Sequence, residues 1–354
     1  MATQQLSAQQ RAANFMTATR QTIQTLPTKQ VTSENSTVQF ELPKTRFLSK
    51  IMLEVDAVAT VVASSGTSVQ KDLYTPYQVL RRVSLDLNNG FSPFIIPGRD
   101  LYFYNLDRLN PNVLLAGTNK KAMNYVENAA STAGVDNRIK FMVELPLTLN
   151  DRDPVGLVML QNPTTNVVLS VDVETLAKAY VLNSANGETA TFKSMSITPV
   201  LETYTIPPVE SAVPDLSVLK LVSSTNQIFA GNGQNIVKLQ VGTIYRKLML
   251  YFADNSNNPL TDADFSGQIE LVFNQADIPY SIKPSVLSAR NASQLGYTLP
   301  DGCYLFDFSY QGIPNLGGSR DYVDTERLTE FWVRFTTTKA GTVTAIAETL
   351  SRLG

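Results

Sequence analysis

Few residues in this sequence could carry acid–base chemistry. Asp151 and Asp153 flank Arg152 just before Pro154. Two carboxylates can serve as acid and base in glycoside hydrolysis, which makes this the first candidate for catalysis. A turn with an internal ion pair accounts for the same residues, because Asp and Pro are favoured in turns. We predict a turn, with a glycosidase working through Asp151 or Asp153 as an alternative.

Other catalytic and metal chemistry is limited by two residue types. The sequence has no histidine, which excludes Ser-His-Asp and Cys-His catalysis and His-bound zinc or haem. The only cysteine is Cys303, so an intramolecular disulfide and a Cys-based metal centre are excluded. Its neighbours Tyr304, Leu305 and Phe306 indicate a buried thiol on a strand. We therefore predict a protein that is not an enzyme and needs no cofactor and no metal.

One acidic loop resembles a calcium-binding loop only at its start. Asp254 opens the stretch, but Pro259 and Phe265 occupy the positions where the loop needs Gly and Glu. We predict a hairpin loop. Asp262 and Asp264 remain as weak cation ligands or, alternatively, as parts of a solvated turn.

Length and charge set the class of protein. The chain has 354 residues, with 29 Lys+Arg against 31 Asp+Glu and a net charge of −2. This length exceeds the roughly 250–300 residues of a single hydrophobic core, so two domains are expected. No cationic stripe is present to neutralise phosphates, which argues against direct nucleic-acid binding. The pattern of a secretion signal and a run of about 18 apolar residues are both missing, so we expect neither secretion nor a membrane span.

Residues 1–35 differ from the rest of the chain. They contain no acidic residue before Glu34 and are rich in Gln, Ala and Thr. Apolar residues partly follow a helical period from Ser7 until Pro27. We predict an N-terminal helical arm, moderately amphipathic, with a flexible terminus as the alternative.

Beyond this arm, the residue pattern is typical of many short strands. β-branched and aromatic runs are separated by Pro, Gly, Asn and Asp, without βαβ alternation. Strands are predicted at 37–42, 48–55, 82–87, 139–145, 156–160, 167–173 and 194–204, and then at 236–241, 246–252, 268–273, 302–308, 329–336 and 341–349. Short helices are expected at 98–109 and 283–295. Three prolines within residues 205–214 separate two domains, 36–208 and 209–354.

The two halves resemble each other in sequence. The segment around Lys50 matches that around Lys247. Six identities follow at one constant separation: Leu85/Leu271, Asn88/Asn274, Pro93/Pro279, Ile96/Ile282, Leu101/Leu287 and Asn105/Asn291. We infer a duplicated domain. Its size and strand number favour an all-β fold of two tandem eight-stranded jelly rolls, a double jelly roll, preceded by the amphipathic helix.

As a set, three passages carry a family resemblance: the Gln/Ala-rich start at 4–14, the stretch 195–204 that leads to the prolines, and the strand entry at 299–307. With the duplicated halves, they make the chain similar to the double jelly-roll major capsid proteins of tectivirus-like tailless bacteriophages with an internal membrane. This resemblance implies a homotrimer that forms a pseudo-hexagonal capsomer of an icosahedral capsid around an internal membrane and a dsDNA genome. It also implies neighbouring capsomers and vertex and minor capsid proteins as partners, a virion location, and synthesis in the host cytoplasm.

The resemblance also gives the arm a role at the base of the capsomer, against internal membrane lipids and neighbouring capsomers. The residues that this implies face apolar partners are Leu6, Phe15, Met16 and Ile23, and those that face anionic lipid or neighbouring capsomers are Arg11, Arg20 and Lys29. A carbohydrate-binding module or viral spike remains an alternative, because jelly rolls often host sugar sites on their loops.

Overall fold

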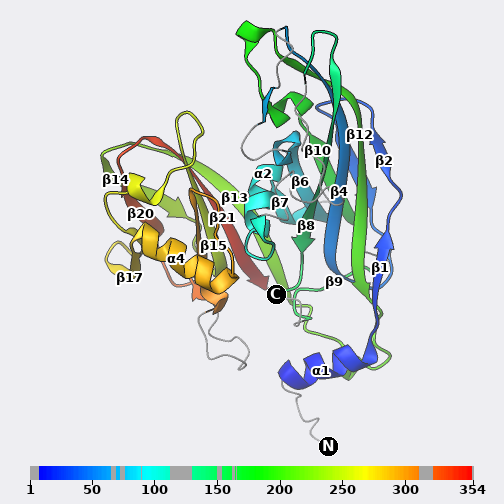
Figure 1. Ribbon diagram of the computed structural model, residues 1–354. Helices are drawn as coiled ribbons and strands as arrows, with labels where there is room; N and C mark the ends of the chain where they lie inside the picture. Colours follow the sequence, from blue (N-terminus) through cyan, green and yellow to red (C-terminus); the bar gives the residue numbers. More distant parts are fainter. Residues whose placement is uncertain are drawn as a thin grey trace, which may run out of the picture. The chain divides into compact units, whose positions relative to one another are not determined.

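The computed structural model describes residues 8–64, 69–71, 76–88, 90–111, 130–149, 154–161, 164, 166–310 and 322–352 (Figure 1). The chain divides into two compact units. The first unit consists of Met1–Tyr102, Asn112–Lys220 and Arg352–Gly354, and the second of Phe103–Pro111 and Leu221–Ser351. Each is a β-sandwich, so the all-β double jelly-roll fold predicted from the sequence is confirmed.

The first unit is built from two sheets. One sheet has the order β1-β12-β4-β8 and the other β3-β10-β6-β7. The bounds of these strands are β1 Gln21–Thr25, β3 Thr37–Glu41, β4 Phe47–Val62, β6 Leu80–Leu87, β7 Phe91–Ile96, β8 Val135–Pro146, β10 Val167–Val173 and β12 Thr189–Tyr204. Short strands pair at the margins: β2 Lys29–Val31 with β12, β9 Val158–Met159 with β4, and β5 Gln70–Lys71 with β11 Tyr180–Val181. The helical segments are α1 Ala8–Ala18, α2 Gly98–Asn105, η1 Tyr77–Val79, η2 Leu176–Ala179, η3 Ser184–Asn186 and η4 Glu210–Ala212. The last three residues of α2, from Phe103 on, belong to the second unit.

The second unit repeats this plan. Its sheets have the orders β13-β21-β15-β18 and β14-β20-β16-β17. The strands are β13 Val218–Phe229, β14 Gly233–Leu239, β15 Ile244–Asp254, β16 Ile269–Phe273, β17 Asp277–Ile282, β18 Cys303–Asp307, β20 Phe331–Thr337 and β21 Gly341–Arg352, with the short β19 Val323–Asp324 beside β15. Its helical segments are α4 Pro284–Leu295, η5 Asp262–Asp264 and η6 Phe308–Tyr310.

The two units share one topology. When the eight main strands of each are counted in chain order, the sheets read 1-8-3-6 and 2-7-4-5 in both. A short helix, α2 or α4, follows the fifth strand each time. This arrangement is an eight-stranded jelly roll, and its repetition confirms the duplication inferred from the sequence.

The matched residues have matching roles. Asn88 and Asn274 both adopt a left-handed backbone after the fourth strand, with φ of 55° and 48°. Each side chain then accepts a hydrogen bond from a backbone N–H beside the seventh strand, that of Asn166 at 2.8 Å and that of Thr329 at 2.8 Å. Asparagine tolerates this conformation because its short side chain bonds locally, which explains its presence in both copies.

The third strands of the two units differ in their outer faces. In β4, buried and half-buried residues alternate, and the outward side chains form cross-strand ion pairs such as Asp56–Arg138 and Glu54–Lys140. In β15, by contrast, nearly every residue is buried. Phe252 packs inward against Phe335 with ring centroids 4.9 Å apart, whereas Tyr251 points the other way. The outer face of β15 therefore needs its own cover.

The segment Phe103–Pro111 buries part of the outer face of β15. Phe103 is fully buried and stacks on Tyr251, with ring centroids 4.3 Å apart. The Tyr297 hydroxyl donates a hydrogen bond of 2.7 Å to the Leu106 carbonyl in the same segment. The units thus differ from the linear division into 36–208 and 209–354, because a piece preceding residue 208 completes the second unit.

The N-terminal region corrects one prediction. The helix is present as Ala8–Ala18, but residues 21–31 are not helical: β1 and β2 both pair with β12. The residues Thr22, Ile23 and Thr25 of β1 are β-branched and favour a strand, and the ladder to β12 satisfies their backbone groups. The prediction of a helical arm over residues 1–35 is therefore wrong beyond Ala18.

The role of Phe103 in the second unit can be tested by substitution. Phe103→Ala should lower the free energy of unfolding of this unit by about 3–5 kcal/mol, because it removes a buried aromatic ring. Urea titration followed by fluorescence of Trp332 reports on this unit, since Trp332 is the only tryptophan and lies in β20. Ile228→Ala is the control: Ile228 is 88% exposed, and its removal should change stability by at most about 0.5 kcal/mol. Equal midpoints for the two variants would contradict this assignment.

Candidate functional site: the N-terminal segment and its seat

Helix α1 is fastened to the first unit through Phe15. This side chain is only 1% exposed, and its ring centroid lies 5.3 Å from that of Tyr204 and 6.3 Å from that of Phe47. Leu157 completes the buried cluster. The helix has 11 residues, which is too short for an isolated helix to be stable in water. Its position therefore depends on this aromatic contact.

The proline-rich segment that follows β12 also contacts the Phe15 cluster. Ile206, Val213 and Leu216 pack against the Phe15 cluster. At the end of α1, the backbone N–H and the hydroxyl of Thr19 both donate to the Phe15 carbonyl, at 3.0 and 2.7 Å. The chain then enters β1, where Arg20 N–H donates to the Thr205 hydroxyl at 2.9 Å. The proline-rich stretch thus contributes apolar contacts to the N-terminal helix.

The predicted apolar contact residues separate into two groups. Phe15 packs against apolar side chains of its own chain and is not exposed to an external partner. Met16 and Ile23 are 54% and 65% exposed and remain available. Leu6 lies outside the described residues.

The predicted basic residues also differ in their surroundings. Lys29 donates a 2.6 Å hydrogen bond to the Gln39 carbonyl, and its ammonium lies 5.2 Å from the ring centroid of Phe40. Arg11 is half-buried, while Arg20 is exposed. The pKa of Asp215 is lowered by hydrogen bonds from Ser217 and, to a smaller extent, by the charge of Arg11. Arg20 and Lys29 are thus both exposed, but the Lys29 ammonium is already engaged by Gln39 and Phe40.

Among the described residues, no helix is long and apolar enough to cross a membrane. The same part of the chain contains no group of three Cys, Asp or Glu residues placed to hold a metal ion.

The acidic candidates have structural partners where the structure describes them. Asp264 caps η5 together with Thr261 and forms a 2.8 Å ion pair with Lys339. Asp262 accepts hydrogen bonds from the hydroxyls of Tyr304 and Ser288, at 2.7 and 3.0 Å. The loop at Asp254 is a hairpin loop, as predicted. Ala253 and Pro259 form an antiparallel bridge across it, and the Asp254 carboxylate accepts hydrogen bonds from the backbone N–H groups of residues 256 and 258. Asp151 and Asp153 lie outside the described residues.

Cys303 is a buried thiol, as its neighbours indicated. It lies on β18 and is 3% exposed. Burial raises the pKa of this thiol, so the reactive thiolate is disfavoured.

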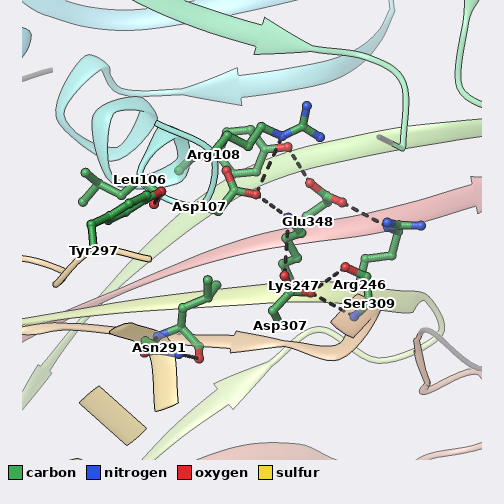
Figure 2. Close-up of polar contacts among 12 residues, drawn as sticks. Leu106, Asp107, Arg108, Arg246, Lys247, Asn291, Tyr297, Asp307, Ser309 and Glu348 are labelled. Carbon is green, nitrogen blue, oxygen red and sulfur yellow. Dashed lines mark hydrogen bonds and ion pairs between the residues drawn. The ribbon is translucent and has the colours of Figure 1, made fainter. Parts of the chain in front are cut away.

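A buried ionic cluster in the second unit was not predicted. Lys247 on β15 forms an ion pair with Asp107, from the segment Phe103–Pro111, and lies 3.6 Å from Asp307 on β18 (Figure 2). Glu348 on β21 pairs with Arg246 at 3.2 Å. Burial alone would lower the pKa of Lys247, but the carboxylates of Asp107, Glu348 and Asp307 outweigh it and raise the pKa. Lys247 is therefore a cation held among carboxylates.

Tyr104 connects the same segment to Glu348. Its hydroxyl donates a hydrogen bond of 2.5 Å to the Glu348 carboxylate. Burial and the nearby charge of Glu348 raise the pKa of Tyr104, which keeps the phenol protonated as a donor. No local sequence pattern could have revealed this cluster, because Asp107 and Lys247 are separated by 140 positions.

No family model and no curated protein matches this chain. Solved structures do resemble it. They include the STIV MCP of Sulfolobus Turreted Icosahedral Virus (14% identity, 94% of this chain and 97% of that chain, TM-score 0.67) and the PBCV-1 virus capsid (12%, 94% and 94%, TM-score 0.66). The major capsid protein P2 from Bacteriophage PM2 is similar at 12% identity over 95% of this chain and 98% of that one, with a TM-score of 0.58. At such identities the likeness establishes the fold, a double jelly roll covering nearly the whole chain.

The anchoring of α1 by Phe15 predicts a local effect. Phe15→Ala should release α1 without unfolding the sandwich, because Phe15 is the helix's buried aromatic contact. Trypsin cleavage at Arg11 and Arg20 should become faster by about tenfold or more, as expected for local opening that loses over 1.4 kcal/mol. Met16→Ala, next to it but 54% exposed, is the matched control and should leave cleavage unchanged. Similar cleavage rates for the two variants would show that something else holds the helix.

Proposed function

We propose that this chain is a major capsid protein, a structural subunit that trimerises and acts without catalysis. The observation that carries the proposal is the presence of two jelly rolls of the same strand order in one chain. Three such chains around a threefold axis supply six similar sandwiches, which gives a nearly hexagonal outline suited to tiling. The likeness to capsid proteins such as P2 of Bacteriophage PM2 supports the same role.

We further propose an icosahedral shell of a tectivirus-like bacteriophage, with an internal membrane and a dsDNA genome. The location is then the virion, after synthesis in the host cytoplasm. Neighbouring trimers and vertex and minor capsid proteins would be the partners. The charged fraction of 17% supports extensive subunit contact, because neutral polar side chains cost less to desolvate than charged ones.

The N-terminal segment is the part proposed to face membrane lipid and adjacent capsomers. Met16 and Ile23 offer exposed apolar side chains, and Arg20 an exposed cation. Near an anionic membrane each cation contributes about 1 kcal/mol, which is too little to hold one subunit. Repeated over a closed shell, such weak contacts become collectively strong through effective concentration.

The trimer is tested by native mass spectrometry of the purified protein. We expect a species of three times the 38.9 kDa chain mass, and negative-stain images of pseudo-hexagonal plates. A monomer that binds immobilised glycans would instead support the sugar-binding module or spike. A monomer that binds none would also contradict the capsid proposal.

The proposed membrane role can be tested by a truncation that removes α1 and leaves the sheet containing β1 intact. Deleting residues 1–19 removes α1 but keeps β1, which begins at Gln21. We expect this variant to trimerise as the full chain does, yet to fail to form membrane-containing particles when produced with the other virion components. Arg20→Ala in the full chain is a milder comparison and should reduce binding to anionic vesicles more than to neutral ones. Normal membrane-containing particles from the truncated chain would refute this role.

A further inference from the structure

The buried cluster in the second unit places an amine directly against a carboxylate. Lys247 and Asp107 form an ion pair in which the side chains are 12% and 2% exposed (Figure 2). Asp307 lies on the neighbouring strand in register with Lys247, with its Oδ2 3.6 Å from Nζ. Its other oxygen accepts hydrogen bonds from the Ser309 N–H and hydroxyl, at 2.9 and 2.5 Å, which fixes its orientation. One amine thus lies within reach of two carboxylates with different surroundings, the buried Asp107 and the partly exposed Asp307.

Asp107 carries an unusual feature for an ionised group. Its Oδ1 atom is buried and has no hydrogen-bond partner among the described residues. A buried carboxylate oxygen without a partner is costly, whereas a neutral amide oxygen in the same place costs much less. Converting the carboxylate to an amide would remove this cost. The charges that remain in the cluster would be two cations, Arg108 and Arg246, and two carboxylates, Asp307 and Glu348.

We infer that Lys247 and Asp107 are joined by an intramolecular isopeptide bond. The Nζ atom of Lys247 bonds to Cγ of Asp107, the bond from Cγ to Oδ2 breaks, and that oxygen leaves as water. Two ammonium protons end on the leaving oxygen, so no oxidant or reductant is required. Asp307 accepts a proton from Nζ, passes it to the leaving oxygen, and finishes unchanged. Oδ1 becomes the amide oxygen.

Exclusion of water favours this condensation. Amide formation releases water, so a site closed to solvent favours the bonded state and holds the reacting atoms together. Phe103 stacked on Tyr251 and the fully buried Leu106 close the surroundings of Asp107. Glu348 serves a different purpose, because Tyr104 and Arg246 already occupy its oxygens.

The first unit supplies a natural control. Lys50 on β4 occupies the position equivalent to Lys247, 3.5 Å from Glu144 and 3.4 Å from Glu202. Its side chain is 20% exposed, and both carboxylates come from adjacent strands of its own sheet. Lys50 is more exposed than Lys247, and neither carboxylate is as deeply buried as Asp107, so we expect no bond there.

The test is to measure the intact mass of the denatured full-length protein and of the variants Lys50→Arg and Lys247→Arg. Any processing of the chain ends is the same in all three proteins, so it does not affect the comparison. After correction for the substituted residue, the natural chain and Lys50→Arg should both be lighter than Lys247→Arg by one water. A tryptic digest should contain a branched peptide joining residues 100–108 to the peptide that begins at Lys247. Full mass for the natural chain, with both residues in unbranched peptides, would overturn the inference and leave an ion pair only.

The part played by Asp307 has its own test. Asp307→Asn keeps the volume of the side chain but cannot accept the proton, so we expect the bonded fraction to fall well below that of the natural chain. A folded Asp307→Asn protein with the complete loss of water would contradict the proton transfer by Asp307. Because the natural chain alone decides whether the bond exists, a variant that fails to fold does not remove the test.

Discussion

The second jelly roll depends on covering a strand that is apolar or buried on both sides. β15 places Leu248, Leu250 and Phe252 in the sandwich core, while Met249 and Tyr251 occupy the opposite face and are equally buried. A sheet face of this kind cannot remain in water at low cost, since each large side chain contributes about 1.5–3 kcal/mol on burial. The segment Phe103–Pro111 supplies the aromatic and ionic partners that this face requires.

This requirement explains why the two copies have diverged. In the first unit, buried and half-buried residues alternate along β4. Its outer face carries ion pairs, which can remain in contact with solvent. In the second unit the corresponding face uses aromatic stacking and a closed set of charges. Jelly rolls with the same strand order thus complete this sheet face in two different ways, although the pairs Lys50/Lys247 and Met52/Met249 are common to both strands.

The fold could largely be predicted from the sequence, because its signals are local. Alternating strands, turn residues such as Asn88 and Asn274, and the repeated order of matches are all visible along the chain. The strand nature of residues 21–31 was missed because apolar spacing there fits a helix, and the ladder to β12 decides otherwise. The burial of Phe15 and the pairing of Asp107 with Lys247 could not be predicted, since each depends on residues distant in sequence and brought together by the fold.

The place of Phe103–Pro111 in the second unit has a consequence for biosynthesis. The segment leaves the ribosome early, but the strands that receive it end with β21 at Arg352. At about 5–20 residues per second, translation of the intervening chain takes roughly ten to fifty seconds. During that interval Phe103 and its neighbours have no finished site. The nascent polypeptide therefore exposes this aromatic segment until β21, the last strand of the second unit, has been synthesised.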